Sequence, residues 1–118
     1  MKDMMKHKGY YGSVHYDSAE LIFYGKLEFI KALVSYEAED AKGIKKVFED
    51  AVDDYLATCE AEGIAAEKPF KGSFNVRTGH KLHEMVALTA QREKMSINKF
   101  ICYILQKECQ KKLKLVIA

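Results

Sequence analysis

The chain has 118 residues, of which 48% are hydrophobic and 31% charged, a composition that excludes a disordered chain and fits one folded domain or two very small ones. No apolar run approaches the ~20 residues that span a bilayer, and no signal-type apolar segment directly follows the basic N-terminus, so we expect a cytoplasmic protein with no membrane contact. The three cysteines, Cys59, Cys102 and Cys109, form no CxxC pair, which favours reduced thiols.

Charge is divided unevenly along the chain. Residues 1–71 hold 10 Lys and 14 Asp or Glu, whereas residues 72–118 hold 9 Lys or Arg and 3 Asp or Glu. A basic half suits contact with phosphates, and an acidic half suits a basic protein partner better than nucleic acid. We therefore predict two domains, 1–66 and 67–118, with different partners. The only proline, Pro69, lies in the expected linker, residues 63–71.

The first domain is predicted to be a small α+β unit of three strands and one helix. Residues 10–16, 21–27 and 33–38 are rich in aromatic and β-branched residues and are joined by short connections, which indicates an antiparallel sheet. Asp40 is placed to cap a following helix, and Gly63 to end it. The expected helix buries one apolar stripe against the sheet, formed by Ile44, Val47, Phe48, Ala51, Val52, Tyr55, Leu56 and Cys59.

The second domain opens with a strand of alternating character, residues 73–78. Within the chain we expect no strand to pair with it, so the simplest solution is pairing with the same strand of a second copy. Such a two-stranded ribbon fits the major groove of DNA. Side chains alternate between its faces, so Ser73, Asn75 and Arg77 would share one face. Arg77 can donate two hydrogen bonds to guanine, and Asn75 can pair with adenine.

Two amphipathic helices should follow the strand. Thr78 can cap a helix over residues 79–93, and Ser96 can cap a second one beginning at Ile97. Two short helices cannot bury both apolar faces alone, so most of their core is expected to lie between two copies. The tail, residues 109–118, can extend the second helix, pair elsewhere or fray. The apolar positions of the two helices are Leu82, Met85, Val86 and Thr89 in the first, and Ile97, Phe100, Ile101, Ile104 and Leu105 in the second.

This pattern resembles the ribbon-helix-helix (βαα) DNA-binding family. The resemblance rests on Phe74-Asn75-Val76-Arg77, Leu82 and Ser96-Ile97-Asn98. It implies a homodimer formed through residues 72–108, with higher oligomers possible, that binds operator DNA. It also implies that the second helix begins on a phosphate, held by Ser96, Ile97, Asn98 and Lys99. Many members of that family have a proline where the first helix opens, whereas this chain has Gly79.

A second resemblance covers both halves. Residues 48–56 and 68–77 look like the corresponding segments of the HicB antitoxin family. In that family the N-terminal βββα part resembles a partial RNase H fold and binds HicA, a small basic toxin that cleaves mRNA, while the C-terminal part dimerises and represses the operon. The resemblance implies an antitoxin of a type II toxin–antitoxin system, without catalytic residues, metal or cofactor.

Alternatives follow from the same residues. The polar face of strand 73–78 can be an ordinary solvated face, and the chain can be an orphan regulator without a toxin. A residual RNase H-like nuclease would need converging carboxylates that hold metal ions. The acidic residues available for that site, which can equally form a solvated helix face or a partner-facing surface, are Asp17, Glu20, Glu49, Asp50, Asp53 and Asp54. His80, His83 and Glu84 have a spacing that a metal could use, but no third sequence-local His or Cys ligand supports them.

Overall fold

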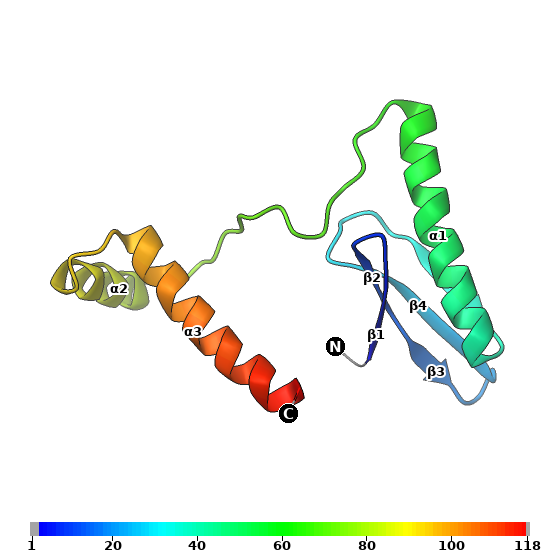
Figure 1. Cartoon of the computed structure of the whole chain (residues 1–118), viewed down its shortest axis with the longest axis horizontal. Coiled ribbons are helices and arrows are strands. Elements are labelled where there is room, and N and C mark those ends of the chain that lie inside the picture. Colours follow the sequence, from blue (N-terminus) through cyan, green and yellow to red (C-terminus); the bar gives the residue numbers. More distant parts are fainter. Residues whose placement is uncertain (1–2, 118) are drawn as a thin grey trace. The chain divides into compact units, whose positions relative to one another are not determined.

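The computed structural model describes residues 3–117, with side chains through Lys114. The chain divides into two compact units, Met1–Ser73 and Phe74–Ala118. The first is an antiparallel sheet with one long helix, and the second is a pair of helices (Figure 1). The predicted α+β class is confirmed. The predicted domain boundary between residues 66 and 67 lies seven residues before the division seen here.

The sheet is built around its longest strand, β4. The strands are β1 (Met4–His7), β2 (Tyr10–Ser13), β3 (His15–Asp17), β4 (Ile22–Glu28) and β5 (Ser35–Ala38). β2 and β3 pair with one edge of β4, β5 pairs with the other edge, and β1 adds to β2, all antiparallel. The three predicted strand regions are therefore strands, but the unit has five strands rather than three. β1 was not predicted.

One predicted strand is divided into two by a close approach of the backbones. β2 and β3 continue a single register along β4, since Tyr11 pairs with Glu28 and His15 pairs with Tyr24. Between them, the Ser13 hydroxyl accepts a hydrogen bond from the Lys26 N–H at 3.0 Å. A side chain at Gly25 would collide with the Ser13 carbonyl, so glycine is required where the strand breaks.

Helix α1 (Ala41–Glu62) covers one face of the sheet and forms the core with it. Its ends are those predicted: the Asp40 carboxylate accepts from the Gly43 N–H at 2.6 Å, and Gly63 ends the helix in the left-handed conformation. Phe48 and Val52 are 1% and 0% exposed, at the centre of the core. The predicted apolar stripe is confirmed, because its other members pack around this centre.

The second unit contains α2 (His80–Arg92) and α3 (Ile97–Ile117). Thr78 does not cap α2, contrary to prediction: Gly79 occupies the cap position at φ 82°, and the Thr78 hydroxyl donates to the Gly79 carbonyl instead. Proline is fixed near φ −65° and could not adopt this conformation. Ser96 caps α3 as predicted, accepting from the Lys99 N–H at 3.1 Å. α3 extends into the tail as far as Ile117; residue 118 lies outside the described part.

Candidate nucleic-acid interface

The predicted reading residues lie in the segment that joins α1 to α2. Ser73, Asn75 and Arg77 are all exposed, and residues 73–79 form neither helix nor paired strand within the chain. The division of the chain falls between Ser73 and Phe74, so Ser73 belongs to the first unit and the other two to the second. The paired ribbon, which needs a second copy, stays a prediction.

The alternate residues of this segment are apolar and open to solvent. Phe74 is 77% exposed and Val76 is 67% exposed. Large apolar side chains at alternate positions of a short segment are typical of a strand whose other face packs on a core. Within one chain, these two side chains therefore have the character of a packing face but little to pack against.

The second group of predicted site residues lies together at the start of α3. Ser96 closes the first turn through two hydrogen bonds, from the Lys99 N–H to its hydroxyl and from the Phe100 N–H to its carbonyl at 2.9 Å. Ile97, Asn98 and Lys99 are exposed on this turn. The first N–H groups of a helix have no intrahelical partners and carry the positive end of the dipole. This end of α3 is therefore chemically suited to an anion, and Lys99 adds a charge.

The helices of the second unit leave most of their apolar side chains in solvent. Ala90 is the buried residue of α2, and among the α3 side chains described through Lys114 only Phe100 is even half-buried. A groove of about 460 Å³ between the helices is lined by Thr89, Glu93, Met95, Phe100, Tyr103 and Ile104. The exposed apolar residues of these helices are Leu82, Met85, Leu88, Ile97, Ile101, Tyr103, Ile104, Leu105 and Leu113. A single copy of the second unit therefore leaves a large apolar surface in contact with water, which is typical of a surface that a partner covers.

Cys102 and Cys109 belong to the same open surface. Both are exposed on α3, whereas Cys59 is buried in the first unit, and all three thiols are free. Cys102 and Cys109 are seven residues apart on α3 and can share one face of the helix, and within a single chain both are open to solvent. The sequence spacing placed them on one helix face but could not show what covers that face.

The acidic face of α1 is paired in part with β1, which was not predicted, and with Lys8 directly after it. Asp53 pairs with the His7 ring at 3.0 Å and with the Lys8 ammonium at 2.9 Å. These two hydrogen bonds, from Lys8 first and His7 second, hold the pKa of Asp53 below its usual range. Glu49 lies 3.9 Å from the other ring nitrogen of His7. Part of the predicted solvated face therefore fastens β1 to α1.

This contact predicts a pH dependence of stability. Because the folded-state pKa of Asp53 is depressed, its contribution is present above the unfolded-state pKa near 4 and is lost as the pH falls through the lower folded value. We expect Asp53→Asn to reduce the fall in the urea midpoint between pH 6 and pH 3, measured by circular dichroism. Asp54→Asn, at the exposed neighbouring position, should leave the profile unchanged; equal profiles for all three proteins would contradict the assignment.

Two of the carboxylates considered for a nuclease, Asp17 and Asp53, have structural partners in this fold. Asp17 accepts from the Ala19 and Glu20 N–H groups at 2.9 and 3.2 Å, closing the turn before β4. Asp53 is paired as described above. Among the described residues, no three His, Cys, Asp or Glu side chains are grouped so that they could hold a metal ion. The same part of the chain contains no helix with the length and apolar character needed to cross a membrane.

Comparison with known proteins gives one match. The model of the HicB family matches residues 55–105, which span the end of α1, the joining segment, α2 and the first part of α3. Neither the curated proteins nor the solved structures contain a significant match. The sheet lies outside the matched residues. Residues 55–105 are therefore similar to the HicB family, which is a toxin–antitoxin family.

Proposed function

We propose that this chain is an antitoxin that neutralises a HicA-like, mRNA-cleaving toxin and represses its own operon as a ribbon-helix-helix dimer. The proposal of DNA binding rests mainly on one observation in the second unit. Its helices have exposed apolar faces, and the segment before them alternates apolar residues with residues of the types that read bases. The family match supports the antitoxin part.

Dimerisation through residues 72–108 accounts for the open surface of the second unit. Among the side chains described through Lys114, the two helices bury only Ala90, and a small unit with so little core needs another source of buried area. A second copy supplies it symmetrically: the two strands pair, Phe74 and Val76 turn onto the helices, and the helix faces close on each other. The pairing also satisfies the backbone groups of the strand.

The proposed ribbon would present Ser73, Asn75 and Arg77 of both copies to the major groove. Arginine and asparagine are the side chains that form two hydrogen bonds with guanine and adenine respectively. The start of α3 would rest on the DNA backbone, with Ser96, Ile97, Asn98 and Lys99 around a phosphate. The base contacts of the ribbon would select the DNA sequence, and the phosphate contacts of α3 would hold the dimer in register on the duplex.

Lys99 tests the phosphate contact. We expect Lys99→Ala to weaken binding to operator and random duplexes by a similar factor, and to lower the slope of log K against log[salt] by about one for each lost contact. The measurement is fluorescence anisotropy between 50 and 300 mM salt, a range chosen around roughly physiological ionic strength. Lys42→Ala, an exposed lysine at the start of α1, is the matched control. A Lys99→Ala variant that loses affinity for one sequence only would contradict the assignment.

The toxin is proposed to bind the first unit. Residues 1–71 carry four more acidic than basic groups, and a basic toxin has the complementary charge. The test is co-purification of the full chain with a HicA-like toxin, followed by an assay of mRNA cleavage. Inhibition of cleavage at a fixed stoichiometry supports the proposal. A chain that binds operator DNA yet leaves cleavage untouched would instead be an orphan regulator.

A further inference from the structure

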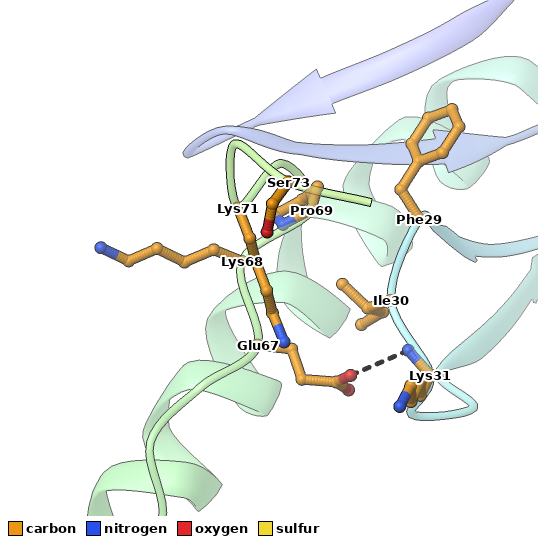
Figure 2. Close-up of a pocket in the computed structure, with 8 residues that line it drawn as sticks. All are labelled: Phe29, Ile30, Lys31, Glu67, Lys68, Pro69, Lys71 and Ser73. Carbon is orange, nitrogen blue, oxygen red and sulfur yellow. Dashed lines mark hydrogen bonds between the residues drawn. The ribbon is translucent and has the colours of Figure 1, made fainter. Parts of the chain in front are cut away.

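Glu67 fastens the segment after α1 to the first unit through four hydrogen bonds. Its N–H donates to the Tyr55 hydroxyl at 3.0 Å, and its carbonyl accepts from the Tyr10 hydroxyl. Its carboxylate accepts from the Lys31 N–H at 3.0 Å and from the Ala32 N–H at 2.9 Å; Figure 2 shows the first of these two bonds. One linker residue is thereby joined to β2, to α1 and to the loop between β4 and β5.

The same loop receives a second residue of the segment. The Phe70 ring lies 5.3 Å from the Phe29 ring and 5.7 Å from the Tyr11 ring, centroid to centroid. Phe29 has a φ of 66°, which a bulky side chain rarely adopts and which its surroundings must therefore hold. Between loop and segment lies a pocket of about 330 Å³. Phe29, Ile30 and Lys31 line it on one side, and the residues of the segment that line it are Glu67, Lys68, Pro69, Lys71 and Ser73 (Figure 2).

The electrostatics of Glu67 match this role. The two backbone N–H groups, Lys31 first and Ala32 second, hold its pKa below the usual range, and the charges of Lys71 and Lys31 act in the same direction. The ionised carboxylate is therefore the form that bonds to the loop. The contact should persist to a pH below that at which an ordinary glutamate is protonated.

These contacts shorten the free connection between the two units. Sixteen residues, 64–79, lie between Gly63, the C-cap of α1, and His80, the first residue of α2, and a flexible chain of that length would have an end-to-end distance of roughly 20–24 Å. With residues 67–73 held on the first unit, only residues 74–79 remain, for which the estimate is roughly 12–15 Å. Most of those six residues are the predicted reading strand itself.

We propose that Glu67 is a positioning residue: it fixes the point at which the reading strand leaves the first unit, and so couples whatever binds that unit to DNA binding. The hydrogen bonds by which Glu67 fastens the segment do not depend on the proposed function. Their effect on toxin binding and operator binding rests on the proposed function. A toxin held on the first unit would act on DNA held by the second through its effective concentration there, which falls roughly as the −3/2 power of tether length. Release from 6 to 16 residues would thus weaken the coupling roughly fourfold.

Amide exchange tests the fastening directly. In the full chain, Glu67→Ala should make the Lys31 and Ala32 amides exchange at least about tenfold faster, because a hydrogen bond to a charged acceptor is lost. Glu67→Gln can accept only one of the two bonds and should release one amide. Wild-type protection of both amides should decline with acidification, whereas Glu67→Ala should show no such profile. Glu60→Ala, an exposed residue of α1, is the control.

Cleavage by trypsin after Lys71 reports the same release, since the held segment is a poor substrate; we expect faster cleavage in Glu67→Ala only. Unchanged exchange and unchanged cleavage would overturn the inference.

The consequence for DNA binding is measured as operator affinity with and without saturating HicA-like toxin. The toxin's effect should shrink roughly fourfold in Glu67→Ala, and an equal effect in both proteins would overturn the coupling. A toxin that never binds the wild type contradicts the proposed function, while the exchange result still decides the fastening.

Discussion

Replacing Arg77 by alanine is expected to abolish discrimination between operator and random DNA while the dimer persists. Each bidentate contact to a base separates right from wrong sequence by about 1–3 kcal/mol. A symmetric dimer carries two copies of Arg77, so the change removes about 2–6 kcal/mol of discrimination if the contributions add. Since 1.4 kcal/mol is tenfold in affinity, the loss should be at least about thirtyfold. The exposed side chain contributes nothing to either core.

The measurement is the ratio of the two dissociation constants at one salt concentration, with sedimentation to confirm the dimer. Arg92, the chain's other arginine, lies exposed in the last turn of α2 and offers a matched control. Arg92→Ala should keep the operator-to-random ratio of the wild type. If Arg77→Ala kept that ratio as well, base reading by this strand would be wrong.

Replacing Phe48 by alanine should strongly destabilise the first unit and spare the second. Phe48 is 1% exposed and packs between α1 and the sheet, with its ring 5.7 Å from that of Tyr36. Removal of a buried phenylalanine side chain costs about 3–5 kcal/mol, through lost burial and the cavity left behind. A domain of this size has a total stability of only about 5–15 kcal/mol, so this loss is a large part of it, and the first unit should unfold and lose toxin binding at a lower temperature than the wild type. Operator binding should survive, because the second unit shares no part of this core.

Thermal unfolding followed by circular dichroism, with operator binding measured on the same sample, tests this expectation. Leu33→Ala removes a side chain that is 80% exposed, so its unfolding temperature should stay close to that of the wild type. If Phe48→Ala lost operator binding at the temperature at which the sheet unfolds, the two units would not act separately.

The first unit was predictable wherever local chemistry decides the structure. Asp40 and Gly63 mark the ends of α1 because a carboxylate and a glycine each solve a problem within one turn of the helix. β1 escaped prediction because Met4-Met5-Lys6-His7 has no alternating pattern; its strand conformation comes from pairing with β2. Thr78 failed as a cap because Gly79, with its positive φ, took the position.

Glu67 shows a different limit. Its carboxylate binds the backbone N–H groups of Lys31 and Ala32, more than thirty residues away. Every residue except proline has such a group, so neither partner leaves a mark in the sequence. By its sequence pattern, Glu67 is part of a linker beside Lys68 and Pro69. Only the fold shows that it holds this segment against the first unit. The ribbon stays a prediction that rests on alternation alone, because the face that each residue of a strand would occupy follows from its position, while the strand that would pair with it belongs to a second copy.

We propose that one chain neutralises a toxin with its first unit and reads DNA with its second. The most direct measurement is mRNA cleavage by a HicA-like toxin, titrated with wild-type protein and with the Arg77→Ala variant. We predict that both stop cleavage at the same stoichiometry, although only the wild type discriminates operator DNA. Cleavage that continues in the presence of excess wild-type protein would contradict the claim.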